Sequence, residues 1–132
     1  MGLTITKTSD KTGTVILVLE GSLDSNTCTL LDKQITEASC TTPLKALVFD
    51  MQQVSFVSSA GIGMVIKAKV SLKRKAVETS LINLQPQVKR VFEIMQLLPS
   101  MNVFENRSEL DEYLSKIQNR IVDEGTSLST QQ

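Results

Sequence analysis

Two adjacent hydroxyl residues, Ser58 and Ser59, stand between an apolar segment and a pair of glycines in the stretch FVSSAGIG. The residues before them have the composition of a strand, and the apolar residues after them recur at helical spacing. Both serines therefore fall where a strand turns into a helix. A phosphate at a helix N-terminus is stabilised by unpaired backbone N–H groups and by the helix dipole. This is suitable chemistry for a regulatory phosphoserine.

A purely structural explanation of the same residues stays open. Serine is one of the commonest N-cap residues, and such a cap is worth about 1 kcal/mol without any phosphate. Gly61 and Gly63 permit close approach of a partner or ligand, but they also permit tight packing against a strand. A phosphate-cradling loop is a weaker option, because neither GxxxxGK[ST] nor GxGxxG occurs in the chain.

The composition excludes several classes of function. Histidine is absent, so the chain cannot assemble a Ser-His-Asp or Cys-His nucleophilic site or the usual imidazole-containing zinc site. Acidic and basic residues balance at 14 each, which argues against general nucleic-acid binding. We expect a protein that is not an enzyme, has no cofactor or metal, and binds no nucleic acid.

The cysteines and the hydropathy pattern indicate the compartment. Cys28 and Cys40 lie on one predicted helical segment and its end, which holds them too far apart to form a disulfide. No apolar run approaches the length of a membrane span, and the first residues lack the features of a secretory signal. We expect a soluble, cytoplasmic protein with reduced cysteines and no membrane contact.

The elements that must position the two serines alternate between strands and helices. Strands are predicted near residues 3–7, 15–19, 44–49, 79–84 and 101–104, and helices near 26–40, 59–75, 86–98 and 108–120. Asp24 or Ser25 is the expected N-cap of the first helix. Crossover connections make the inner strands parallel, so we predict an α/β fold with a mixed, largely parallel sheet of about five strands and about four helices. Residues 1–122 form the expected single domain, and 123–132 the expected disordered tail.

Functional groups in an open α/β sheet gather at the C-terminal ends of strands. Asp24 and the Ser58-Ser59 pair both fall at such turns. An enzymatic alternative, a nucleotide-binding domain or small hydrolase using Asp24, Asp50 and Ser59, would need these groups to converge around a metal ion.

Three segments resemble the STAS domain family of the anti-sigma-factor antagonist type. VFDMQQVSFVSSAGIGMVIKA is similar to the family's signature, a strand ending in Asp, a loop of the form V-S-[FY]-x-D-S-[ST]-G-[LI]-G and a helix. LVLEGSLDSNTCTLLDKQI resembles its G-x-L-D turn and first helix, and NLQPQVKRVFEIMQLLPSMNVFENRSELDEYL its last strands and helices. The resemblance covers about Leu3 to Ile121.

The resemblance implies a STAS-like fold and a partner-switching function. Such a protein binds an anti-sigma factor that is also a serine kinase, and thereby frees a sigma factor. The kinase phosphorylates one serine of the antagonist, which breaks the complex, and a PP2C-type phosphatase restores it. The phosphoacceptor position of the family falls on Ser59, and Asp24 matches the acidic residue of the G-x-L-D turn. We expect a monomer or weak dimer.

The chain departs from the family pattern on both sides of Ser59. Ser58 stands where the family usually has Asp, and Ala60 where it usually has Ser or Thr. Ser58 is therefore an alternative phosphoacceptor. The same departures favour a second hypothesis, a constitutive scaffold domain of a signalling complex that has lost phosphotransfer.

Small side chains around Ser59 suit close docking of a partner, and a phosphate of about −1.5 to −2 charges there would oppose it. Met64 has an alternative explanation, partial burial in the core. The predicted partner-binding residues are Ser22, Asp24, Ser25, Asn26, Ser58, Ser59, Ile62, Gly63 and Met64.

Overall fold

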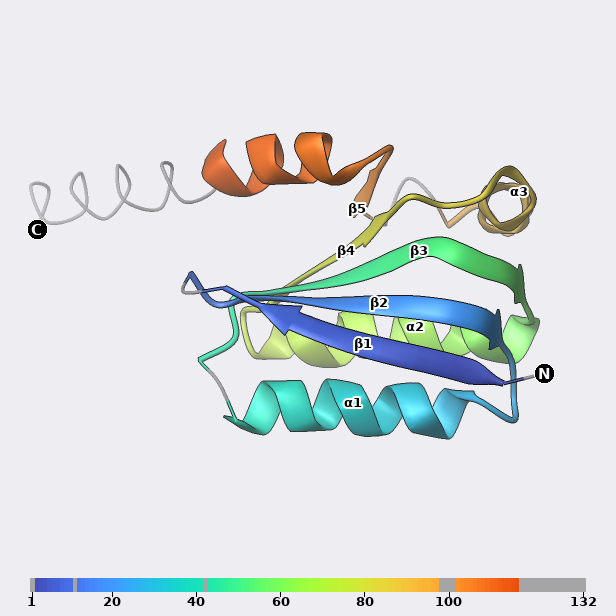
Figure 1. The fold of residues 1–132 in the computed structure, drawn as a ribbon, viewed down its shortest axis with the longest axis horizontal. Coiled ribbons are helices and arrows are strands. Elements are labelled where there is room, and N and C mark those ends of the chain that lie inside the picture. The colour runs from blue at the N-terminus through green and yellow to red at the C-terminus, as the bar shows by residue number, and fades with distance from the viewer. Residues whose placement is uncertain (1, 11, 42, 98–101, 117–132) are drawn as a thin grey trace, which may run out of the picture.

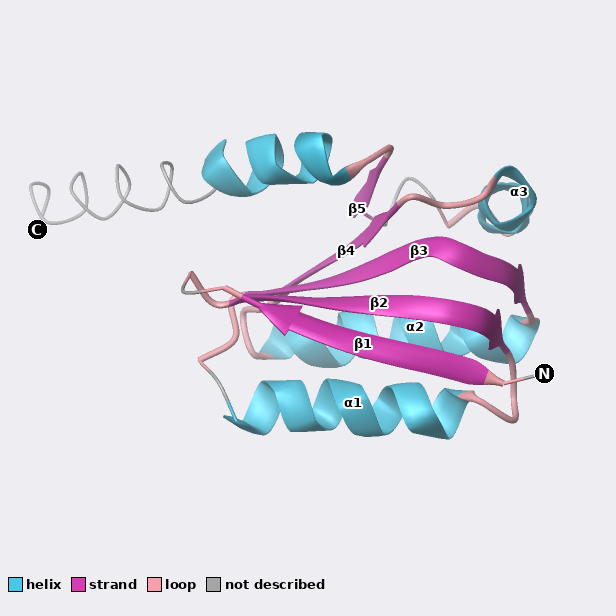
Figure 2. Cartoon of the chain, viewed as in Figure 1, coloured by secondary structure: helices cyan, strands magenta, loops and turns pink. Residues whose placement is uncertain are grey.

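A five-stranded sheet flanked by helices forms the body of the protein in a computed structural model that describes residues 2–10, 12–41, 43–97 and 102–116 (Figures 1 and 2). Its elements are β1 (Leu3–Ser9), β2 (Thr14–Leu23), α1 (Cys28–Thr41), β3 (Ala46–Val57), α2 (Ser59–Arg74), β4 (Glu78–Ile82), α3 (Pro86–Ile94) and β5 (Asn102–Phe104). Residues 107–116 form a further helix. The predicted order of strands and helices is confirmed, and the expected tail at 123–132 lies outside the described residues.

The strands follow one another across the sheet in the order β1-β2-β3-β4-β5. β1 pairs with β2 in antiparallel fashion, whereas the pairs β2–β3, β3–β4 and β4–β5 are parallel. The tight turn between β1 and β2 forms around Asp10, whose Oδ1 accepts the N–H groups of Thr12 at 2.9 Å and Thr14 at 3.2 Å. The predicted mixed, largely parallel α/β sheet is confirmed.

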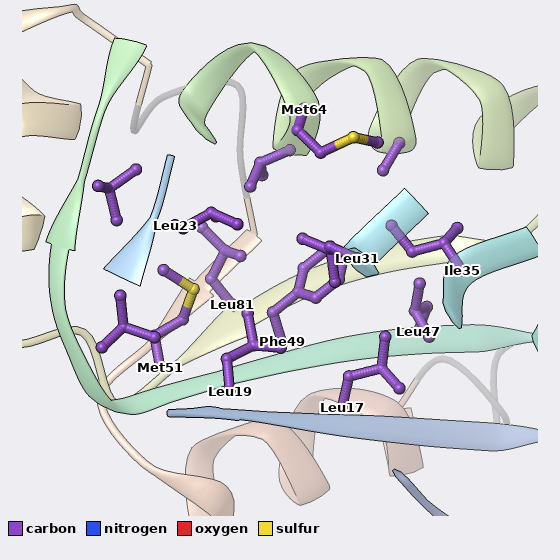
Figure 3. Packing of buried hydrophobic residues seen from close by; sticks show 14 of the residues in the cluster. Leu17, Leu19, Leu23, Leu31, Ile35, Leu47, Phe49, Met51, Met64 and Leu81 are labelled. Carbon is purple, nitrogen blue, oxygen red and sulfur yellow. The ribbon is translucent and has the colours of Figure 1, made fainter. Parts of the chain in front are cut away.

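Alternation along the inner strands divides the core between the two faces of the sheet. Leu47 and Phe49 of β3 point to the face that α1 and α2 cover, where they join the main cluster with Leu31 and Met64 (Figure 3). Val48 points to the opposite face and packs with Leu110 of the last helix. Because helices cover both faces here, the first four residues of β3, Ala46 to Phe49, are apolar without interruption.

β3 runs further than its apolar residues indicate. The predicted strand covered residues 44–49, but the observed strand continues to Val57. β4 stops opposite Asp50, at Ile82, and from there β3 pairs with β2 alone through two shifts of register. The Asp50 carboxylate accepts a hydrogen bond from Asn83 Nδ2 at 3.1 Å, so it ties the end of β4 to the middle of β3.

Two further expectations can be compared with the described residues. Cys28 and Cys40 are free thiols, as predicted. Within the described part of the chain, every helix is too short or too polar to cross a bilayer.

Candidate phosphorylation and docking site

Ser58 is the N-cap of α2. Its backbone is extended, with φ −85° and ψ 172°, and its Oγ accepts a hydrogen bond from the N–H of Gly61 at 3.2 Å. Its own N–H donates to the carbonyl oxygen of Leu23 at 2.9 Å. The structural explanation of the serine pair is therefore correct for Ser58, which fixes the start of α2 against the end of β2.

Ser59 is the first residue of α2 and is exposed. Its side chain has no hydrogen-bond partner among the described residues, in contrast to that of Ser58. The hydroxyl stands beside the unpaired N–H groups of the helix N-terminus, where the backbone is partially positive. Of the two serines, Ser59 is therefore the more exposed.

The turn between β2 and α1 is closed by Asp24. Its Oδ1 accepts the N–H groups of Asn26 at 2.9 Å and Thr27 at 3.2 Å, and its carbonyl oxygen accepts the N–H of Cys28 at 3.0 Å. Asp24 thus provides the capping chemistry expected of Asp24 or Ser25, while regular helix begins only at Cys28. Ser25 and Asn26 are left exposed at the tip of this turn.

The Asp24 turn and the serine turn lie side by side at one end of the sheet (Figure 1). β2 and β3 are parallel neighbours, and their last residues, Leu23 and Val57, are paired in register. Across the adjoining helix starts, the Cys28 Sγ donates to the carbonyl oxygen of Ala60 at 3.5 Å. Partial burial and the charge of Asp24 raise the pKa of the Cys28 thiol.

The two glycines of the signature have different environments. A Cβ atom at position 61 would overlap the carbonyl oxygen of Leu23, whereas one at position 63 would meet nothing within 4 Å. Gly61 therefore permits the close packing of α2 on β2. Gly63 lies on the exposed side of α2, one turn after Ser59, and leaves the helix surface low there.

Three of the predicted contact residues are interior residues, and the prediction that their side chains meet a partner is corrected. Ser22 and Ile62 have no exposed surface, and Met64 is 8% exposed. Ile62 and Met64 belong to the main core because α2 turns these positions toward the sheet and α1. The alternative reading of Met64, burial, is the correct one. Asp24 and Ser58 are half-buried, and Ser25, Asn26, Ser59 and Gly63 are exposed.

Two exposed apolar residues near this surface were not among the predicted contacts. Phe56, two residues before Ser58, is 52% exposed at the end of β3. Val70, two turns after Gly63 on α2, is 49% exposed. Strict alternation would not have indicated Phe56, because it places this residue on the same face as the buried Val54. The register shift between β2 and β3 near Ser55 breaks the alternation and leaves Phe56 exposed.

The carboxylate constellation required by the enzymatic alternative does not assemble. Asp50 lies in the middle of β3, eight residues before Ser58, which corresponds to roughly 25 Å of extended strand. Asp24 lies next to the serine turn and is therefore equally far from Asp50. Among the described residues, no group of three or more His, Cys, Asp or Glu side chains is placed to hold a metal ion.

The chain belongs to the STAS domain family, whose sequence model matches residues 6–110. It is 24% identical over 94 residues to an anti-sigma F factor antagonist of Paenibacillus polymyxa, covering 71% of this chain and 80% of that protein. It is 28% identical over 88 residues to an anti-sigma F factor antagonist of Lysinibacillus sphaericus, covering 67% and 75% respectively.

A solved structure shares the fold. The Bacillus cell fate determinant SpoIIAA in its phosphorylated form superimposes with a TM-score of 0.65 at 24% identity, over 83% of this chain and 99% of that one. The STAS-like fold expected from the sequence is thereby confirmed.

Removing the Ser58 hydroxyl is expected to cost about 1 kcal/mol of unfolding free energy in Ser58→Ala, because the Gly61 N–H loses its cap. Ser59→Ala should change that free energy by less than about 0.5 kcal/mol, since the side chain is exposed. Urea denaturation of the two variants provides the comparison. Equal losses would contradict the assignment of the cap to Ser58.

Proposed function

We propose that this protein is an anti-sigma-factor antagonist. It binds an anti-sigma factor in the cytoplasm and thereby releases a sigma factor, acting as a binding module and not as an enzyme. The family membership and the names of the two relatives support this function. The docking surface consists of the exposed and half-exposed residues at the starts of α1 and α2, with Phe56 at its border: Asp24, Ser25, Asn26, Ser58, Ser59, Gly63 and Phe56.

The observation that carries the proposal is the position of Ser59. It is an exposed serine with a free hydroxyl, at a helix N-terminus, beside the Asp24 turn. We take Ser59 as the residue that the partner, a serine kinase, phosphorylates, and a PP2C-type phosphatase as the enzyme that reverses the modification. Ser58 is the poorer phosphoacceptor because the residue is half-buried and its Oγ already accepts a hydrogen bond from the Gly61 N–H.

Phosphorylation at Ser59 would act on docking and not on folding. The helix dipole and the free N–H groups at the start of α2 stabilise an anion locally, so the fold tolerates the phosphate. The added charge of about −1.5 to −2 is strongly hydrated, and a close contact would have to desolvate it. The phosphorylated surface is therefore expected to release the partner.

The constitutive scaffold remains the second candidate. It is favoured by Ser58 and Ala60, which leave Ser59 without the neighbouring carboxylate and hydroxyl of the family pattern. In this case the same surface would bind its partner, but the complex would persist in the presence of ATP.

Docking at this surface can be tested with Gly63→Gln. The position is exposed with open space around it, so the fold should accept the larger side chain, while a closely docked partner would be displaced. We expect binding to the anti-sigma factor encoded in the same genome, measured by titration calorimetry, to weaken about tenfold or more, the equivalent of about 1.4 kcal/mol. Ser71→Gln, at an exposed position two turns further along α2, is the matched control and should bind like the wild type. Equal binding by all three proteins, or no binding by the wild type, would refute the docking surface.

A further inference from the structure

β1 is a long, unprotected edge of the sheet. It is the terminal strand in the order β1-β2-β3-β4-β5, and none of the described strands pairs with its outer side (Figure 2). It has seven residues, no proline and one charged side chain, Lys7, and five of the seven residues are exposed. β5, at the opposite edge, has only three residues. Exposed edges of this length template pairing with another strand unless proline, charge or a bulge prevents it.

The hydrogen bonds flanking β1 show which of its backbone groups face outward. At one end Ser22 N–H donates to the carbonyl of Gly2, and at the other Asp10 N–H donates to the carbonyl of Thr14. Both hydrogen bonds join even-numbered residues that are opposite one another in the β1–β2 register. In an antiparallel ladder, hydrogen-bonded pairs alternate with pairs that are not hydrogen-bonded. The even-numbered residues of β1 therefore bond to β2. The odd-numbered residues direct their N–H and C=O groups toward the open edge: Leu3, Ile5, Lys7 and Ser9.

We propose that a second copy of this chain pairs with this edge, β1 against β1, to form a two-fold symmetric dimer with a continuous ten-stranded sheet. Antiparallel pairing must place odd residues opposite odd residues, so that outward N–H groups meet outward carbonyls. Of the registers that satisfy this condition, the one centred on Thr6 pairs all seven residues of both strands. It places Leu3 opposite Ser9, Thr4 opposite Thr8, Ile5 opposite Lys7, and Thr6 opposite Thr6.

The side chains of β1 are self-complementary in this register alone. The threonines form cross-strand Thr–Thr pairs, and the aliphatic stem of Lys7 covers the half-buried Ile5 of the other copy. A shift of two residues in one direction would set Lys7 opposite Lys7, where like charges repel. A shift in the other direction leaves Thr8 and Ser9 unpaired. Charge and pairing therefore select the register centred on Thr6.

α1 also carries an exposed apolar residue, Leu30, away from α2. Cys28 and Asp32 of this helix face α2, the first through its contact with Ala60 and the second in the groove between the two helices. Leu30 lies about 200° around the helix from both, on the flank turned away from α2, and is 49% exposed. In Figure 1 α1 is the helix next to β1. The exposed Leu30 therefore lies away from the groove between α1 and α2.

Dimerisation through β1 would not occupy the exposed face of α2, on which Gly63 lies. The inference is therefore independent of the proposed function, and either can fail alone.

Lys7→Pro tests the edge directly. Proline at this position removes an outward N–H and leaves the bonds to β2 in place, and it is tolerated on edge strands. In sedimentation velocity from micromolar to millimolar concentration, the wild type should show a rising dimer fraction. The dimer dissociation constant should increase roughly tenfold or more in Lys7→Pro, since two hydrogen bonds are lost across the two-fold axis. Lys7→Ala is the control: it keeps the N–H and loses only the stem that covers Ile5, so it should dimerise more tightly than Lys7→Pro.

Thr6 tests the register, and the result does not depend on whether Lys7→Pro folds. Thr6→Lys and Thr6→Glu each place two like charges in contact at the two-fold axis and should be more monomeric than the wild type. An equimolar mixture should recover dimers, all of them containing one copy of each variant. A monomeric wild type over the whole range would overturn the proposal and leave the edge open to an extended segment of another protein. Dimers that are unchanged in Lys7→Pro, or a mixture that stays monomeric, would overturn it equally.

Discussion

Gly61→Ala is expected to lower the free energy of unfolding by about 1–3 kcal/mol, although it adds a single methyl group. The new Cβ would overlap the Leu23 carbonyl oxygen, which is backbone and cannot rotate away. The overlap can be removed only if α2 moves away from β2. That movement stretches the hydrogen bond from the Ser58 N–H to the same carbonyl oxygen. The variant should also disturb the surface on which Ser59 stands.

Gly63→Ala is the matched control for this prediction. It makes the same chemical change two residues later in the same helix, where the added Cβ meets nothing within 4 Å. Replacing a glycine inside a helix by alanine should raise the free energy of unfolding by about 0.5–1 kcal/mol. Urea denaturation gives both values. Changes of the same sign in the two variants would contradict the close packing of α2 on β2.

Ser59→Asp is expected to weaken binding to the anti-sigma factor about a hundredfold, the equivalent of about 2.7 kcal/mol. The carboxylate imitates part of the phosphate charge and would be desolvated in the contact. The fold itself should not suffer, because an acidic side chain in the first turn of a helix interacts favourably with the helix dipole. Urea denaturation measures the stability of the variant, and titration calorimetry on the folded protein measures its binding to the anti-sigma factor.

Two controls accompany Ser59→Asp. Ser59→Ala removes the hydroxyl without adding charge, so it should bind like the wild type. Ser58→Asp retains a side-chain acceptor for the Gly61 N–H, and Asp is the residue that the family usually has at this position, so it should also bind. A Ser59→Asp protein that binds with wild-type affinity would show that this position lies outside the contact.

The order of elements could be predicted because each strand and helix repeats its apolar residues at its own period. Ile62, Val65 and Ile66 mark α2, and β-branched runs mark the inner strands. The length of β3 could not be predicted. Gln52 and Gln53 interrupt the apolar run, and the strand persists past them only because β2 supplies a partner as far as Val57. Pairing between distant segments decided this boundary.

The sequence could predict that Asp24 and the serine pair lie close together at the candidate site, but not which side chains around them are exposed. Two strands that both lead into helices end at the same edge of a parallel sheet, which brings Asp24 and Ser59 together. Which side chains of α2 face outward depends on how α1 and the sheet pack against it. That packing turned Ile62 and Met64 inward and left Gly63 exposed. The capping bond that distinguishes Ser58 from Ser59 is likewise a property of the folded turn.

The most direct test of the central claim is to map phosphate on the protein after incubation with ATP and its anti-sigma factor kinase. Mass spectrometry should find one phosphate, on Ser59, and Ser59→Ala should accept none while Ser58→Ala is phosphorylated like the wild type. Phosphate on Ser58, or no phosphate on the wild type from a kinase that binds it and hydrolyses ATP, would contradict the account.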